Sequence, residues 1–338
     1  MANIAYIICS KPEINHAGTR ISALNIFELL QREGHNPFIL YNPPHMNVES
    51  KPQLDGIVEK AVQEYGVKPP DVVYFQQVYG ANAIQAAGQF AAQDIKTILG
   101  IYDVVEPEMA EACSATIVPS EYLKSRYPSH LQDRIHVVHD GIEQPHIYKE
   151  RYSQHFATNR QPIKAVIITA DRLERLPVLE ECPKYVSITV FGVYDQRQNP
   201  GVQDFQNFYA IPWFPTVFER LPSFDLGLIP VELNDDGSQF CSRSSKSANR
   251  LTQLMGAGLP VIASPVPAYQ DIVTNGINGY IARSQQEWLA YLKELRDGSR
   301  RKRMGKAARN RVINSFSQEI QAALVSDVIN KLSNVETV

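Results

Sequence analysis

The sequence lacks several features that would place it quickly in a class of proteins. Its 338 residues include only four cysteines, which lie far apart and form no C-x-x-C pair: Cys9, Cys113, Cys182 and Cys241. Neither a metal site nor a disulfide framework is expected from them, and a reducing compartment is the natural setting. No run approaches the ~18 apolar residues of a membrane-spanning helix. The first apolar run, "NIAYIIC", has no basic region before it, so we expect a buried strand rather than a signal peptide, and a cytoplasmic protein.

Basic residues are not in excess either. The chain has 33 Lys and Arg against 36 Asp and Glu, for a net charge of -3, which argues against a nucleic-acid partner. Hydrophobic residues make up 44% and charged residues 20%, an ordinary globular composition. Because single hydrophobic cores stop growing near roughly 250–300 residues, a chain of this length favours two domains.

Short apolar runs alternate with helix-like segments along the whole chain. This alternation is typical of α/β proteins with parallel sheets covered by helices on both faces. We therefore predict two Rossmann-like domains that face each other across a cleft. The runs expected to be strands are "NIAYIIC", "PFILY", "DVVYFQQ", "KTILGIY", "ATIVPS" and "IHVVHDG" in the first half, then "IKAVIITA", "VSITVFGV", "QNFYAIPW", "DLGLIPV", "LPVIAS" and "NGYIA" in the second.

A polar stretch without periodicity, at about residues 144–162, is expected to connect the two domains. We therefore place an N-terminal domain at 1–150, a C-terminal domain at 151–315 and a terminal helix at 316–338. In open α/β sheets, ligands bind outside the carboxyl ends of the strands, so the cleft between the domains is the expected site.

The stretch "KSANRLTQLMGAGLPVIASPVPAYQDIV" predicts a helix, a buried strand and a second helix. Leu251, Leu254 and Met255 fall on one helical face, and Gly258 is placed to end the helix in a left-handed cap. We expect this first helix to begin at Lys246 or just before.

Hydroxyl and basic side chains gather around that expected helix start. Free backbone N–H groups at a helix N-terminus, together with hydroxyls and cations, form an anion site. Ordinary N-capping with solvated bases is the alternative. The residues concerned are Arg243, Ser244, Ser245, Lys246, Ser247 and Arg250.

The same region resembles the C-terminal domain of group 1 (family four-like) glycosyltransferases. The resemblance is strongest over about residues 223–295, and it extends to "GTRISALNIFELLQREGH", "SATIVPSEYLK" and "VVHDGIE". It implies the GT-B architecture and the transfer of a sugar from a nucleoside-diphosphate sugar to an acceptor hydroxyl, mostly with retention of anomeric configuration. The expected setting is glycan, glycolipid or polysaccharide biosynthesis. The resemblance also implies that the terminal helix packs back on the first domain.

Carried over to matching positions, the resemblance makes Lys246 and Arg172 catalytic, with Arg175 as a looser candidate for the second base. Their cationic groups would stabilise the leaving diphosphate, and no cofactor or metal is expected. The family often has two glutamates where this chain has Ser245 and Gln253, and these departures put donor affinity or activity in doubt. Further donor-binding candidates from the "K-S-x-N-(K/R)" helix start are Ser247, Asn249 and Arg250.

The loop after the first strand, "SKPEINHAGTR", corresponds to a family loop that lies over the donor diphosphate. Gly18 is expected to let the backbone approach the ligand, Thr19 to cap the following helix and Arg20 to meet phosphate. His16 is an acceptor-side candidate, although an ordinary loop histidine is the simpler alternative.

Polar residues also follow other predicted strands. Asp103 is a candidate to assist removal of the acceptor proton, and Gln76 and Gln77 suit sugar hydroxyls. Asp271 matches an acidic family position at a helix start. For Asp103 the alternative is a cap of the following turn, and for Gln76 and Gln77 it is a packed turn. For Asp271 the alternative is a favourable contact with the helix dipole.

Two other functions remain open at this stage: a catalytically inactive nucleotide-sugar or glycan binding protein, and a nucleotide-sugar epimerase. A nicotinamide oxidoreductase is disfavoured because no G-x-G-x-x-G follows an opening strand. The partners expected are a nucleotide-sugar donor and a saccharide or lipid-linked acceptor. The basic segment "RDGSRRKRMGKAARNR" is either a peripheral contact with the inner membrane surface or a solvated helix face.

Overall fold

A computed structural model shows the chain as two compact units. The first comprises the described residues of Met1–Glu143, Gly237–Ser247 and Gln318–Val338, and the second those of Gln144–Asp236 and Ala248–Ser317. The structure describes residues 1–12, 17–43, 54–63, 69–169, 182–192, 208–212, 214–233 and 243–333.

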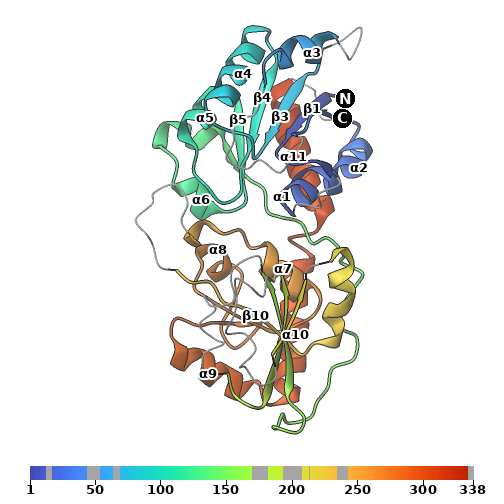
Figure 1. Cartoon of the computed structure of the whole chain (residues 1–338), viewed down its shortest axis with the longest axis vertical. Coiled ribbons are helices and arrows are strands. Elements are labelled where there is room, and N and C mark those ends of the chain that lie inside the picture. Colours follow the sequence, from blue (N-terminus) through green and yellow to red (C-terminus); the bar gives the residue numbers. More distant parts are fainter. Residues whose placement is uncertain are drawn as a thin grey trace. The chain divides into compact units, whose positions relative to one another are not determined.

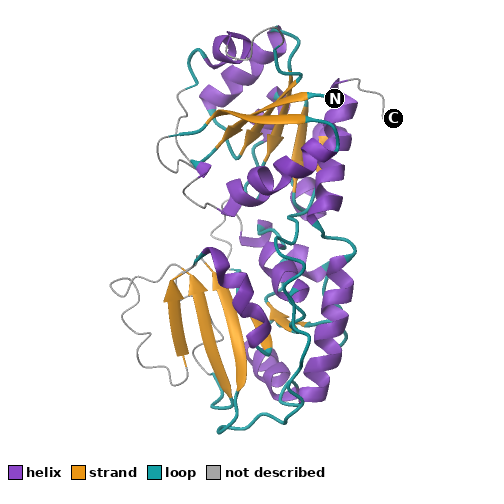
Figure 2. Cartoon of the chain, turned by 90° about the vertical axis from the view of Figure 1, so that its right-hand side faces the viewer, coloured by secondary structure: helices purple, strands orange, loops and turns teal. Residues whose placement is uncertain are grey.

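Each unit is built on a six-stranded, fully parallel sheet with helices packed on it (Figures 1 and 2). The twelve strands found among the described residues all coincide with apolar runs expected from the sequence. In the first sheet the order is β2 (Asn36–Tyr41), β1 (Asn3–Ile8), β3 (Val72–Gln76), β4 (Lys96–Gly100), β5 (Ala115–Val118) and β6 (Ile135–Val137). In the second it is β12 (Tyr280–Ile281), β11 (Val261–Ala263), β10 (Leu226–Ile229), β7 (Ile163–Thr169), β8 (Val186–Gly192) and β9 (Phe208–Pro212).

The helices follow the strands as parallel crossovers require. In the first unit they are α1 (Ala17–Thr19), α2 (Asn25–Arg32), α3 (Ile57–Gln63), α4 (Ala81–Ala92), α5 (Pro107–Ala112), α6 (Glu121–Ser125) and α11 (Gln318–Ser333). In the second they are α7 (Asn249–Gly256), α8 (Pro267–Gln270), α9 (Gln285–Glu294) and α10 (Gly298–Ile313).

Strand β1 shows why these strands read as continuous apolar runs. Successive side chains point to opposite faces of a sheet. Ala5 and Ile7 join the core formed with α3 and α4, whereas Ile4, Tyr6 and Ile8 join the core formed with α2 and α11. Because both faces of the sheet are covered, the strand sequence does not alternate between apolar and polar residues.

Helix α11 belongs to the first unit, although it follows the whole second unit in the sequence. It packs against α2, as Figure 1 shows for the red helix beside the blue one. Its buried residues Ala322, Val325, Val328 and Ile329 contribute to the same core as Ile4 and Tyr6.

Two helix starts differ from the expectation. Arg20–Leu24 forms a π-helical turn before α2, and the buried apolar side chains of this segment include Ile21, Ile26 and Leu30. Helix α7 begins at Asn249 rather than at Lys246; the preceding residues Arg243–Ser245 form a separate 3-10 turn.

The end of α7 agrees with the sequence. Gly258 has φ +81, its N–H donates to the Met255 carbonyl, and the Leu259 N–H donates to the Leu254 carbonyl. This is the Schellman arrangement, which ends the helix before Pro260, and β11 begins directly after that proline.

Candidate functional site

Strand order locates one candidate ligand edge in each unit. Where the strand order of an open parallel sheet reverses, the two adjacent crossovers lie on opposite faces of the sheet. This leaves a crevice at the carboxyl ends of the two strands. In the first unit the change of direction falls between β1 and β3, where Ile8 pairs with Gln76. In the second it falls between β7 and β10.

The end of β3 forms a buried polar cluster with the loop after β1. Gln76 is fully buried, and its Oε1 accepts hydrogen bonds from the Thr19 hydroxyl (3.2 Å) and the Cys9 N–H (3.3 Å). The Thr19 hydroxyl also lies 2.8 Å from that of Ser10. Burial raises the pKa of the Cys9 thiol, so this sulfur is a neutral packing group rather than a nucleophile.

Thr19 therefore does not cap a helix as expected. Helix α1 begins before it at Ala17, and Thr19 itself has helical angles (φ -63, ψ -43) without a side-chain cap bond. Gly18 lies in the same helical turn, and its carbonyl accepts a hydrogen bond from the Ser22 hydroxyl. His16 lies outside the described residues.

Gln77, Asp103 and Lys246 form a polar chain at the carboxyl edge of the first sheet. Gln77 has φ +50, a left-handed conformation that is uncommon for a residue other than glycine. Its Nε2 donates to Asp103 Oδ1 at 3.4 Å, and Asp103 Oδ2 lies 3.6 Å from Lys246 Nζ. The Lys246 and Asp103 side chains are 34% and 40% exposed, so a dissolved anion can reach the ammonium group.

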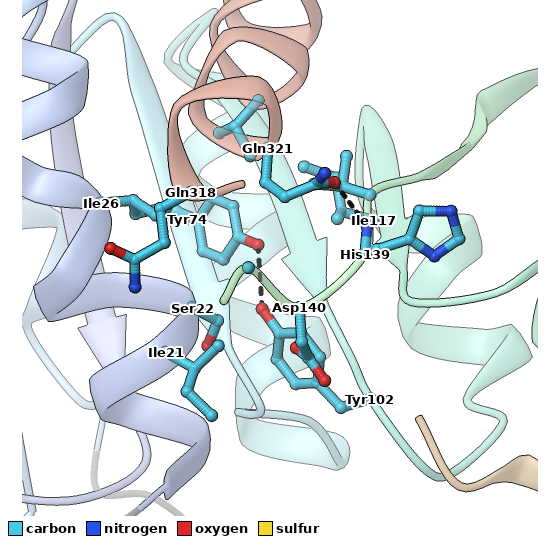
Figure 3. Close-up of a pocket in the computed structure, with 13 residues that line it drawn as sticks. Ile21, Ser22, Ile26, Tyr74, Tyr102, Ile117, His139, Asp140, Gln318 and Gln321 are labelled. Carbon is cyan, nitrogen blue, oxygen red and sulfur yellow. Dashed lines mark hydrogen bonds between the residues drawn. The ribbon is translucent and has the colours of Figure 1, made fainter. Parts of the chain in front are cut away.

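Asp140 lies just after β6 and lines a pocket beside the same edge (Figure 3). Burial, with smaller contributions from the nearby carboxylates Glu143 and Asp103, raises its pKa to about 6 despite a hydrogen bond from Ser247. Tyr74 and Tyr102 line the pocket with their hydroxyls 3.4 Å apart. Burial raises the pKa of both phenols, to about 12 for Tyr74, so they are neutral groups.

Arg20 at the start of the π-helical turn is paired with Glu143. The guanidinium donates to both carboxylate oxygens, at 2.6 and 3.0 Å, and Asn25 Nδ2 donates to the same carboxylate at 3.0 Å. The two-point Arg–carboxylate geometry fixes the loop after β6 to the helical segment after β1.

In the second unit, Arg250 and Thr169 meet at the end of β7. Arg250 Nη1 donates to the Thr169 hydroxyl at 3.1 Å, which places a cation on the candidate edge of that sheet. Asn249 and Gln253 lie on α7, and Gln253 is 5% exposed. Arg172 and Arg175 lie outside the described residues.

One family model matches part of this chain, and several solved structures align with nearly all of it. Residues 68–147 match the model of the glycosyl transferase family 4 group. HepE of Anabaena, solved with UDP, covers 98% of this chain and is itself covered completely, with a TM-score of 0.69 at 13% identity. The chain has the GT-B fold of glycosyltransferases. A search of the curated proteins found no match.

Two further GT-B structures align over nearly the whole chain. The sucrose-phosphate synthase of Thermosynechococcus elongatus covers 99% of it, with a TM-score of 0.70 at 13% identity and 100% of its own length. A glycosyltransferase from Rickettsia africae gives 0.69 at 12% identity, with 99% of each chain covered. The resemblance and the fold expected from the sequence are thereby confirmed, at the level of family match and architecture.

Within this GT-B fold, one expected local structure is wrong, and one of the alternatives does not hold. Asp271 does not start a helix: α8 is a single turn that begins at Pro267, and Asp271 follows it as the C-terminal cap residue. A carboxylate there lies at the unfavourable end of the helix dipole. The serines before α7 do not cap it either, because its N-cap residue is Ala248, without a side-chain cap bond.

The structure adds residues that the sequence did not single out. Asp140, Glu143 and Asn25 all belong to the polar edge of the first unit. Asp140 follows an apolar strand just as Asp103 does, so the signal for it was present in "IHVVHDG". Glu143 and Asn25 gave no such signal, because they meet only through the tertiary fold.

Neither a metal cluster nor a membrane span is found among the described residues. There, no group of three or more His, Cys, Asp or Glu side chains is placed to bind a metal ion. The described helices are all too short or too polar to cross a bilayer.

Proposed function

We propose that this chain transfers a sugar from a nucleoside-diphosphate sugar to an acceptor hydroxyl, with retention of configuration and without a metal. The observation that carries the proposal is the partly exposed Lys246 ammonium at the carboxyl edge of the first sheet, in a chain with the GT-B fold. An exposed ion pair such as Lys246–Asp103 is worth about 0–1 kcal/mol. A diphosphate with two or more charges is therefore able to displace Asp103 from the lysine.

The chemistry assigned to these groups is simple. As the bond between the sugar C1 and the diphosphate oxygen breaks, Lys246 stabilises the charge that develops on the leaving group. The acceptor oxygen forms the new bond to C1, and its proton passes to the leaving phosphate or to Asp103. Arg172 and Arg175 keep their assignment as further candidates for the diphosphate, and Gln77 for sugar hydroxyls, whereas Gln76 is fully buried and bonded within the first unit.

UDP is the first nucleotide to test, because HepE of Anabaena was solved with UDP and with UDP-glucose. Thermal unfolding should be followed with UDP, GDP, dTDP and ADP in turn. A nucleotide at about 100 times its Kd adds about 2.7 kcal/mol to the stability of the state that it binds. The acceptor is proposed only as a class, a saccharide or a lipid-linked saccharide.

Replacement of the lysine tests the catalytic assignment. We expect Lys246→Ala to lower kcat at least about 100-fold with the nucleotide sugar identified above, the scale of a lost charge stabiliser. Lys306→Ala is the matched control, because Lys306 is an exposed lysine of α10. Equal turnover by Lys246→Ala and the control would remove Lys246 from the mechanism.

A binding protein without catalysis is the second candidate. Ser245 and Gln253 stand where the family often has glutamates, and both are buried, at 3% and 5% exposure. Neither supplies the charge-assisted hydrogen bonds of a carboxylate. Nucleotide binding without any detectable sugar transfer or epimer formation would support this candidate, whereas transfer excludes it.

A further inference from the structure

Two residues other than glycine have a left-handed backbone among those that the structure describes, Gln77 (φ +50) and Asp94 (φ +58). This conformation is unfavourable for residues with a Cβ, although aspartate and asparagine tolerate it better than most. Asp94 directly follows the cap residue of α4, where a left-handed residue commonly ends a helix. Gln77 lies at the end of a strand and has a longer side chain, so its conformation has a different reason.

The left-handed residue Gln77 connects the ends of two neighbouring strands. It directly follows β3, and its N–H donates to the carbonyl of Gly100, the last residue of β4, at 2.8 Å. Gln77 is only 7% exposed, and its Nε2 donates to Asp103 Oδ1 at 3.4 Å. The unfavourable backbone conformation therefore brings an amide donor to a carboxylate, and strained residues of this kind cluster at functional sites.

The backbone of Asp103 does not by itself fix the carboxylate. Residues 101–106 connect β4 to α5 and belong to no helix or strand. The second carboxylate oxygen, Oδ2, lies 3.6 Å from Lys246 Nζ, and both groups are partly exposed. In the function proposed above, the donor diphosphate displaces Asp103 from this lysine. The neutral amide of Gln77 is not attracted to a diphosphate, so its hydrogen bond to Asp103 persists when the ion pair separates.

We propose that Gln77 is a positioning residue for glycosyl transfer: its side-chain amide holds the Asp103 carboxylate in place to take the acceptor proton. As the acceptor oxygen bonds to the sugar C1, the electron pair of the C1–oxygen bond leaves with the nucleoside diphosphate, and the acceptor proton passes to Asp103. The inference rests on the proposed function and extends it to a residue that acts through Asp103. It requires no contact between Gln77 and the sugar.

Two replacements separate the amide of Gln77 from its backbone strain. Gln77→Ala and Gln77→Gly both remove the amide, but only glycine adopts the left-handed conformation without strain. Both should lower the turnover of UDP-glucose about tenfold, the scale of a lost hydrogen bond to a charged group. Turnover is measured on the full chain as release of UDP, with water as the acceptor. The Kd for UDP should stay within about twofold of the wild type, because Gln77 acts on the acceptor proton and not on the diphosphate.

Thermal unfolding of the same two variants shows whether the lost turnover is a loss of stability. Gln77→Gly should unfold about 2–4 °C above Gln77→Ala, although the two have equal turnover. A turnover that follows the stability of the variants would make Gln77 a structural residue and overturn the inference. If Gln77→Ala does not fold, Gln77→Gly removes the same amide and serves in its place.

Asp94 is the matched control for the strain. It has the same left-handed backbone, its side chain is 93% exposed, and it lies beyond the carboxyl end of α4, away from the edge where β3 ends. Asp94→Gly should again unfold about 2–4 °C above Asp94→Ala, and both should keep wild-type turnover.

A double-mutant cycle tests whether Gln77 acts through Asp103. Asp103→Ala should lower turnover at least about tenfold, and Gln77→Ala should cause no further loss in that background. An undiminished further loss would mean that Gln77 contacts the sugar directly, and this overturns the inference. Wild-type turnover in Gln77→Ala or in Asp103→Ala overturns it equally.

Failure of the proposed function itself gives a different result. A wild-type chain that binds none of the four nucleotides rejects the function and the inference together. A chain that binds UDP but turns over no UDP-sugar supports the binding protein, in which Asp103 takes no proton and Gln77 positions nothing. Turnover that is indifferent to Gln77 rejects the inference only.

Discussion

At the residue scale, the two aspartates at the edge of the first sheet have different environments. Asp103 is 40% exposed and pairs with Lys246. Asp140 lies in a pocket with Tyr74 and Tyr102, where burial beside other carboxylates raises its pKa to about 6. Ionisation of Asp140 is therefore unfavourable in the folded state relative to the unfolded chain.

This difference predicts a pH-dependent effect of Asp140→Asn on stability. Between about pH 4 and pH 6 the unfolded chain has lost the Asp140 proton while the folded chain still retains it. The contribution of Asp140 to the free energy of unfolding therefore falls as pH rises through this window and is constant above it. Asparagine does not titrate, so the variant should gain stability relative to the wild type from pH 4 to pH 7.

Urea unfolding at several pH values measures this gain. Asp133→Asn is the control, because an exposed carboxylate should show little change across the same range. A stability difference between Asp140→Asn and the wild type that is flat with pH would contradict the environment described for Asp140.

Individual polar residues were predictable only where they follow an apolar strand. Asp103, Gln76 and Gln77 are examples. The burial of one arginine in the basic segment was not predictable in this way. Arg301 is 1% exposed, and its guanidinium donates to the carbonyls of Leu295 and Arg296. Those carbonyls become neighbours of the guanidinium only when the helix packs, so sequence patterning describes this arginine as solvated.

At the element scale, strands were easier to predict than helix ends. A strand buried on both faces shows as an uninterrupted apolar run, and β1 and β3 do so. The π-helical turn at Arg20–Leu24 shifts the helix phase without any sequence mark of its own. Likewise, three serines suggested a capped helix start, but α7 begins one turn later because residues 243–245 form their own turn.

Two glycines in different positions give opposite predictions for substitution by alanine. Gly258 has φ +81, and an added Cβ would lie 2.7 Å from the Tyr152 hydroxyl oxygen. Gly258→Ala should therefore destabilise the second unit by about 1–2 kcal/mol, since alanine resists this conformation. The loss should appear as a lower Tm in thermal unfolding.

Gly88 is the control, because it lies inside α4 with no atom within 4 Å of an added Cβ. Gly88→Ala should stabilise the first unit by about 0.5–1 kcal/mol, the usual difference in helix propensity. A loss of stability at Gly88, or none at Gly258, would show that the backbone at these positions differs from that described.

At the scale of the whole molecule, α11 completes the first unit. Ile329 is fully buried in the core that also contains Ile26 and Leu30 of α2. Ile329→Ala should lower the stability of the first unit by about 2–5 kcal/mol, through lost burial and the cavity left behind. The change should affect the first unit's unfolding transition and leave that of the second unit in place.

Leu324→Ala provides the control on the same helix, because Leu324 is 38% exposed. Its effect should stay within about 0.5 kcal/mol, as for most surface positions. Equal effects at Ile329 and Leu324 would mean that α11 contributes no core to the first unit.

The alternation of strands and helices was enough to predict two parallel sheets, but not the order of strands in them. Both orders, with their changes of direction at β1/β3 and β7/β10, depend on which way each crossover turns. The grouping of residues 243–247 with the first unit was equally hidden, since the Lys246–Asp103 ion pair joins segments far apart in the sequence.

The position of α11 in the sequence has a consequence for biosynthesis. The ribosome completes the strands of the first sheet early, but the helix that covers one face of that sheet is made after every residue of the second unit. During translation, the part of the apolar face of Ile4, Tyr6 and Val72 that α11 covers is therefore exposed until that helix emerges. All residues of the second unit are synthesised before the first unit can be completed, so the nascent first unit is the part of the chain on which chaperones would act.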